Sequence, residues 1–151
     1  ANRLYFVSQQ NTIMMKIANK EPKSIFQPVG IAMILAASKN HLAYRSHRPN
    51  LLALHELPSG EQIWQVALSK SWDKNESMIL DQGLLYHVHP QIGLEVYCSY
   101  RGAKLYSSQK STVGQFGLIK TPQGVLFGYG KRAIHLLPHP KNWPPEHNYL
   151  P

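Results

Sequence analysis

The feature that most constrains this fold is a repeat with a period of about forty residues, a length typical of propeller blades. Four short segments carry an aromatic residue at the same place, with separations of 38, 42 and 41 residues. These aromatic residues are Phe6, Tyr44, Tyr86 and Phe127. A second series follows each of them at a lag of 20, 20, 20 and 16 residues, and its members are Phe26, Trp64, Tyr106 and Trp143. Two series with one period indicate four copies of a structural unit.

Within one copy, the pattern predicts four short strands. Residues 50–57 and 62–66 are two β-prone runs on either side of a Pro-Ser-Gly-Glu turn, and residues 94–100 and 103–106 repeat this arrangement around Arg101-Gly102. A further apolar run precedes the second, third and fourth aligned aromatic segments, at 31–37, 78–80 and 116–119. Turn-like pairs follow these runs, and they are Lys39-Asn40, Gln82-Gly83 and Gln123-Gly124. The sequence therefore predicts an all-β chain of about four propeller-like blades with four antiparallel strands each.

A helix over Gly30–His47 is the competing interpretation of the second copy. Alanine, methionine and leucine favour helices, and this stretch is rich in them. Lys39-Asn40 interrupts it, however, at the place where the other copies turn. The all-β interpretation is therefore preferred.

The strand–turn–strand units resemble the quinoprotein-type (PQQ-like) β-propeller repeat, which reads Ala-x-Asp-x-x-x-Gly-x-x-x-Trp. Gly60 and Trp64 keep its spacing, whereas His55 replaces the aspartate and one extra residue precedes Gly60. Gly102 and Tyr106 keep the spacing with tyrosine in place of tryptophan. WD40 repeats are similar at this level, but their terminal Trp-Asp pair does not follow these segments. The resemblance implies a propeller scaffold and no particular activity, because unrelated functions are built on this fold.

The repeat boundaries predict an incomplete ring. The copies cover approximately residues 1–29, 30–70, 71–111 and 112–143, and a Pro-rich extended tail follows at 144–151. The first copy begins at its second strand, so that its innermost strand is missing. We therefore expect either a piece of a larger propeller or a ring that a partner chain completes.

The second aromatic series is predicted to pack between blades. A propeller blade buries both of its faces against its neighbours, and a large ring near the outer strand fills this space. This structural role is assigned to Phe26, Trp64, Tyr106 and Trp143.

A metal site is the sharpest chemical alternative. His87 and His89 are two residues apart on a predicted strand and therefore point to the same face, as metal ligands do. Glu95 and His135 complete a possible ligand set that loosely resembles a cupin motif, which implies a small β-barrel metal-dependent enzyme. The cupin interpretation leaves the first 70 residues and the fourfold repeat unexplained.

Positive charge is the remaining functional clue. The 151 residues contain 16 Lys and Arg against 8 Asp and Glu, a net charge of +8. The residues predicted to form a basic binding face in two equivalent loops are Arg45, His47, Arg48, Lys131 and Arg132. Such a face suits an acidic protein surface, a phospholipid headgroup or nucleic-acid phosphates.

The sequence favours a non-catalytic protein-interaction scaffold in a larger propeller or multi-subunit assembly. No serine lies in a Gly-x-Ser-x-Gly elbow, and Cys98 is expected to fill space within a strand. No cofactor is predicted, because a quinone needs a complete ring and acidic calcium ligands. The longest apolar run, residues 31–37, is far shorter than the ~20 residues of a membrane-spanning helix, so no transmembrane segment is predicted.

Overall fold

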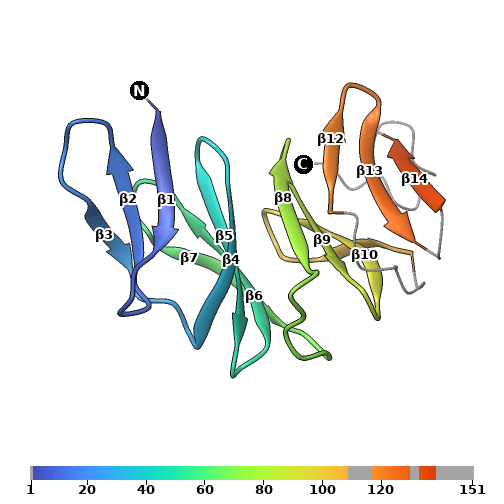
Figure 1. Ribbon diagram of the computed structural model, residues 1–151, viewed down its shortest axis with the longest axis horizontal. Helices are drawn as coiled ribbons and strands as arrows, with labels where there is room; N and C mark the ends of the chain where they lie inside the picture. Colours follow the sequence, from blue (N-terminus) through green and yellow to red (C-terminus); the bar gives the residue numbers. More distant parts are fainter. Residues whose placement is uncertain (1, 109–116, 130–132, 139–151) are drawn as a thin grey trace. The chain divides into compact units, whose positions relative to one another are not determined.

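The computed structural model describes residues 2–108, 117–129 and 133–138, and all regular structure in these ranges is β-strand (Figure 1). Fourteen strands form four antiparallel sheets across the described part of the chain. The all-β prediction is thus confirmed, and the helical alternative for Gly30–His47 is wrong, because that stretch forms two paired strands. Within these ranges no helix has the length and apolar character needed to cross a membrane.

Each sheet is a meander in which consecutive strands pair. The first sheet consists of β1 (Arg3–Val7), β2 (Ile13–Ile17) and β3 (Lys23–Phe26). The second consists of β4 (Ile31–Ala37), β5 (His41–His47), β6 (Leu51–Glu56) and β7 (Gln62–Ala67). The third consists of β8 (Ser77–Asp81), β9 (Leu84–His89), β10 (Gly93–Cys98) and β11 (Lys104–Ser107). The fourth consists of β12 (Ile119–Thr121), β13 (Gly124–Tyr129) and β14 (Ala133–Pro138).

The chain divides into two compact units, Ala1–Trp72 and Asp73–Pro151, and each unit holds two sheets. Each of the four sheets lies inside one of the four expected repeats. Trp143 and the expected tail at 144–151 lie outside the described residues.

The core of the first unit lies between its two sheets. Side chains from β5 and β6 form one wall, with Leu42, Tyr44 and Ala53 fully buried. The fully buried Ile13 of β2 faces them, together with partly buried rings and aliphatic chains from β1 and β3. The alternation of side chains along a strand explains this wall, because residues two apart share a face.

The core of the second unit is built in the same way. Leu84, Tyr86 and Val96 project from one face of the third sheet, and Val125 and Phe127 of the fourth sheet pack against them. In each unit, one face of a three-stranded sheet packs on a four-stranded sheet. We call the first and fourth sheets the end sheets, and the faces that form these cores their inner faces.

The hairpin turns correct one part of the predicted alignment. The turn between β12 and β13 is Pro122-Gln123, since Thr121 pairs with Gly124. A glycine is required at 124, because a Cβ there would collide with the carbonyl oxygen of Leu137 and φ is 147°.

Counting from the turns makes Tyr44, His87 and Phe127 equivalent, so the assignment of Tyr86 to this aromatic series is wrong by one residue. Tyr44 and Phe127 point toward the preceding sheet of their unit, whereas Tyr86 points toward the following one. A shift of one residue in a strand reverses the face to which a side chain points.

Candidate interaction site

Arg45 does not belong to a basic surface, because it is fully buried in β5. Its Nη1 donates to the Ser46 carbonyl (2.5 Å) and to Asn50 Oδ1 (3.2 Å), and its Nη2 donates to the Lys70 carbonyl (2.9 Å). The guanidinium carbon also lies 5.9 Å from the centroid of the Trp72 ring. The prediction that Arg45 lies in a loop and faces a partner is therefore wrong.

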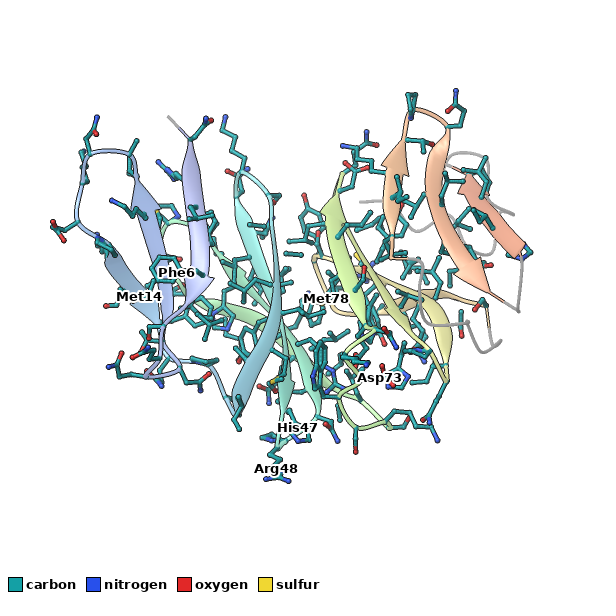
Figure 2. The ribbon with its side chains drawn as sticks, viewed as in Figure 1. Phe6, Met14, His47, Arg48, Asp73 and Met78 are labelled. Atoms are coloured by element: carbon teal, nitrogen blue, oxygen red, sulfur yellow. The ribbon has the colours of Figure 1, made fainter. Side chains whose placement is uncertain are left out.

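The other members of the predicted basic face are dispersed or undescribed. His47 ends β5 and is half-buried, with Nδ1 3.3 Å from Asn50 Oδ1 (Figure 2). Arg48 follows in the β5–β6 turn, where it is exposed and has a φ of 54°. Lys131 and Arg132 lie outside the described residues. Arg48 is thus the one exposed member of this set within the described ranges.

His87 and His89 belong to a buried hydrogen-bonded cluster that contains Glu76. His87 Nε2 lies 2.6 Å from Glu76 Oε1, and His89 Nε2 lies 3.7 Å from Glu76 Oε2. The backbone N–H of Asp73 donates to the same carboxylate at 2.8 Å. All three side chains of the cluster are almost completely buried. Such a cluster stabilises the fold where it is and offers no surface to a substrate.

The structure does not bring all four proposed metal ligands together, although Glu95 lies opposite His87 across β9 and β10. Glu95 pairs with Lys104 instead, and the described residues contain no group of three or more His, Cys, Asp or Glu that could hold a metal ion. His135 pairs with Phe127 across β13 and β14 and therefore shares its face, which packs on the opposite side of the third sheet from His87. The third sheet separates these histidines, so the predicted four-residue ligand set is wrong.

The Glu95 carboxylate also accepts a hydrogen bond from Tyr97 on the same face of β10. Burial raises the pKa of Tyr97, and the negative charge and hydrogen bond of Glu95 raise it further. The hydroxyl of Tyr97 therefore stays protonated and is no candidate for general-base chemistry. This part of the third sheet is a satisfied polar network.

Three residues of the second aromatic series lie in the described part of the chain. Phe26 of β3 stacks on His55 of the neighbouring sheet, with ring centroids 3.7 Å apart and an angle of 4° between the planes. Tyr106 of β11 packs against the core of the second unit, and Trp64 of β7 is buried. Phe26 and Tyr106 therefore fill the space between two sheets.

Among the described strands, β1 lies at an open edge of the first sheet. The sequence pattern does not show which backbone groups face this edge. The Ser8 N–H donates to the Thr12 carbonyl at the end of the β1–β2 hairpin (2.9 Å). Backbone groups alternate in direction along a strand, so the odd-numbered Arg3, Tyr5 and Val7 direct theirs away from β2. Among the described strands, β2 is the one partner of β1. The other three sheets have a strand, β4, β8 or β12, at the corresponding edge.

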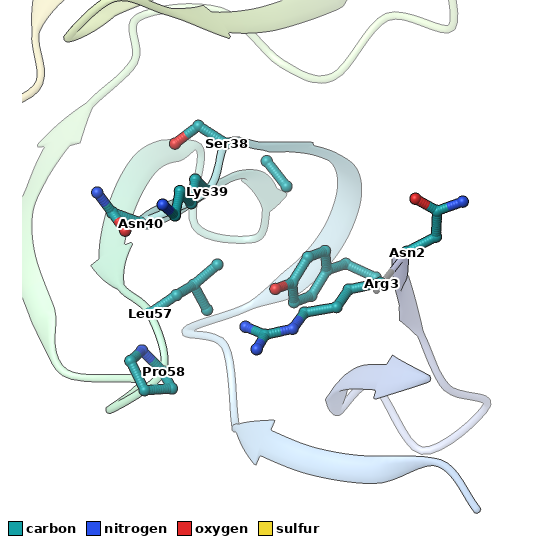
Figure 3. A pocket seen from close by; sticks show the side chains of 9 residues that line it. Asn2, Arg3, Ser38, Lys39, Asn40, Leu57 and Pro58 are labelled. Atoms are coloured by element: carbon teal, nitrogen blue, oxygen red, sulfur yellow. The ribbon is translucent and has the colours of Figure 1, made fainter. Parts of the chain in front are cut away.

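A pocket of about 690 Å³ opens where β1 begins, beside the β4–β5 turn (Figure 3). Arg3 and Lys39 supply positive charge, Leu57 and Pro58 supply an apolar wall, and Asn2, Ser38 and Asn40 supply polar groups. A smaller cavity of about 220 Å³ shares Arg3 and adds Lys23. Among the residues that the structure describes, no Asp or Glu lines either space. The arrangement favours an anionic group.

The two end sheets also carry apolar outer faces. On the fourth sheet, Ile119, Ile134 and Leu136 are 59%, 60% and 46% exposed, and their strand pairing places them on the face opposite the core. On the first sheet, Leu4 is 63% exposed, and Phe6 and Met14 of the same face are half-buried (Figure 2). The sequence shows that side chains alternate between the two faces along β1. Only the strand pairing shows that the first and fourth sheets both carry apolar side chains on the face opposite their core.

Comparison with known proteins adds information on the fold. No protein family and no curated protein matches this sequence. Among solved structures, the chain is similar to the crystal structure of the computationally designed Ika4 protein, with a TM-score of 0.66 and 11% identity. The similarity covers 91% of this chain and 86% of that one. At this identity the similarity is one of fold.

Proposed function

We propose that this chain is a non-catalytic protein-interaction scaffold, and that its four sheets are blades of a β-propeller of the quinoprotein or WD40 type. In this proposal the blades form part of a larger propeller or a multi-subunit assembly. The repeat of about forty residues supports the propeller assignment, as do meanders of up to four antiparallel strands.

The apolar outer faces of both end sheets carry this proposal. A sheet in a propeller buries both faces, and the inner faces of these two sheets do so within their own units. Their outer faces instead leave large aliphatic side chains in solvent, with Leu4 and Ile134 more than half exposed. Apolar side chains gathered on one face, beside the polar remainder of a surface, mark a contact with another protein. The occupant proposed here is a further sheet of the same repeat type.

The test is the mass in solution of the purified chain, alone and with any co-purifying chain, over a wide range of concentration. We expect masses above the 17.1 kDa of one chain for the wild type. Ile134→Lys should restore the mass of a single chain without lowering the free energy of unfolding, because the side chain is exposed. Gln123→Lys adds the same charge to the exposed β12–β13 turn and is the matched control.

A single-chain mass at every concentration, with no binding of a hydrophobic dye to the wild type, would contradict the proposal. The same holds if Gln123→Lys and Ile134→Lys dissociate the assembly equally. In that case net charge, and not the apolar face, controls the association.

A further inference from the structure

We propose that the pocket beside β1 receives a carboxylate side chain from an extended, acidic partner segment that pairs with the free edge of β1. This inference rests on the proposed scaffold function and names the chemistry of one partner. Its basis is a comparison between the first sheet, which has three described strands, and the four-stranded third sheet.

The backbone of β1 is oriented to accept an added strand. Arg3, Tyr5 and Val7 direct their N–H and carbonyl groups to the edge that no described strand covers. In the second sheet, the Ser38 N–H donates to the His41 carbonyl at 2.8 Å, and His41 begins β5 as Arg3 begins β1. The added strand would therefore run antiparallel to β1, as β4 runs to β5.

The third sheet has a first strand at the edge that corresponds to the open edge of β1, and this strand carries a carboxylate. Asp81 ends β8 and pairs with Leu84, the first residue of β9. Its carboxylate lies 2.7 Å from the Nζ of Lys120, which comes from the first strand of the following sheet. The Asp81 charge is also felt by Tyr86, whose pKa rises to about 12 through burial and, to a smaller extent, through this carboxylate. A cation on the next sheet thus binds a carboxylate on the first strand of the sheet before it.

The pocket at the start of β1 contains the cations for such a contact, and no Asp or Glu is among its described lining residues. A residue opposite Arg3 on an added strand would share the face of Arg3 and Tyr5, and Tyr5 packs toward the second sheet. Its side chain would therefore enter the pocket that Arg3 and Lys39 line (Figure 3). Within the described ranges, neither of these cations has an ion-pair partner.

Charge complementarity identifies the occupant as acidic. The pocket holds two cations, its smaller neighbour adds Lys23, and the described lining of both contains no Asp or Glu. The whole chain carries a net charge of +8, which also attracts acidic segments. The apolar wall of Leu57 and Pro58 accommodates the aliphatic part of an extended peptide.

The probe is a fluorescein-labelled peptide, Ser-Met-Ile-Leu-Asp-Gln-Gly, the sequence of residues 77–83, and its matched control carries Asn in place of Asp. Fluorescence anisotropy is measured with the full chain and with three variants. These are Arg3→Ala, Lys39→Ala and, as a cation outside the pocket, Lys20→Ala, where Lys20 lies exposed in the β2–β3 turn. Circular dichroism confirms that each variant is folded.

We expect the Asp peptide to bind the wild type about fivefold more tightly than the Asn peptide, the effect of one partly exposed ion pair. Arg3→Ala and Lys39→Ala should reduce this preference, whereas Lys20→Ala should leave it unchanged. Arg3→Pro should weaken both peptides more than Arg3→Ala, because proline also removes an N–H from the free edge while sparing the pairing with β2.

Equal binding of the two peptides, or a preference that survives both Arg3→Ala and Lys39→Ala, overturns the inference. So does stabilisation of the wild type by inorganic phosphate that Lys39→Ala abolishes, in the absence of any peptide binding. That result would assign the pocket to a small anion. None of these outcomes alters the solution mass of Ile134→Lys, so failure of the inference and failure of the scaffold proposal are distinguishable.

Discussion

The second and third sheets hold a tyrosine and a histidine at equivalent positions but in exchanged order. In the second sheet, Tyr44 lies on β5 and His55 lies on β6, two residues after the residue that pairs with Tyr44. In the third sheet, His87 lies on β9, and Tyr97 lies on β10 in the same relation to it. The two sheets have the same strand pairing at these positions. The difference between the two sites therefore comes from the groups that each ring contacts.

The rings of the second sheet use backbone partners. The Val29 N–H donates to the Tyr44 hydroxyl at 3.0 Å, and His55 Nδ1 lies 2.8 Å from the Gly60 carbonyl oxygen, to which it donates. Phe26 stacks on the His55 ring. Burial raises the pKa of Tyr44 and the Val29 hydrogen bond partly opposes this shift. Both rings are thus held neutral in an apolar space.

The rings of the third sheet use carboxylates. His87 contacts Glu76, which comes from the segment before β8, and Tyr97 contacts Glu95 on its own strand. Glu95 in turn pairs with Lys104 of β11. The same sheet pattern therefore accommodates either an aromatic cluster or an ionic one, and the choice depends on residues outside the repeated positions.

Among the changes that test this comparison, removal of the Glu76 carboxylate should lower the free energy of unfolding most. Glu76→Ala leaves His87 and His89 without their buried anion, and we expect a loss of about 3–5 kcal/mol in the free energy of unfolding. Glu76→Gln keeps an acceptor for the Asp73 N–H and should cost less. Urea denaturation measures both. A loss below about 1 kcal/mol for Glu76→Ala would show that the cluster contributes little to stability.

The corresponding change in the second sheet should be milder. Tyr44→Phe removes the hydroxyl that accepts the Val29 N–H and leaves this donor partly buried, at a cost of about 1–2 kcal/mol. Tyr5→Phe is the matched control, because Tyr5 lies at the edge of the same core and its hydroxyl makes no hydrogen bond among the described residues. Equal losses for the two variants in urea denaturation would refute the importance of the backbone partner.

Much of the fold could be predicted from the sequence, because it depends on local rules. Apolar alternation and turn residues indicate the strands, and the turns around Pro58-Ser59-Gly60 and Arg101-Gly102 are where the pattern places them. The pattern also aligns β1 with β5, and among the described strands β1 lies at the edge of its sheet. The predicted alignment is wrong at Tyr86. Tyr86 and His87 are adjacent rings, and the sequence alone does not show which of them points to the same face of the sheet as Tyr44.

The candidate sites were harder to predict, because they depend on contacts between distant segments. Arg45 looks like a solvent-facing cation in the sequence, yet it lies in a strand that is buried on both faces and finds its acceptor at Lys70. Glu76 lies in a polar segment that resembles a linker, and no local pattern shows that its carboxylate turns inward. The pocket at Arg3 and Lys39 joins residues that are far apart in the chain. Composition shows the positive charge but not its location.

The smallest expected effect is a difference in the response to acid, and it tests whether His55 is held neutral. Burial lowers the pKa of His55, and its hydrogen bond to Gly60 opposes this shift only in part. Below a pH of about 6.5 the unfolded chain binds a proton at this residue before the folded chain does, so the free energy of unfolding falls as pH decreases. His55→Asn keeps a donor near Gly60 and removes the titrating group. Its stability should therefore fall less steeply than that of the wild type between about pH 7.5 and pH 5, measured by urea denaturation. Parallel pH profiles for the two proteins would mean that His55 is protonated equally in the folded and unfolded chains, and the neutral aromatic cluster of the second sheet would then be wrong.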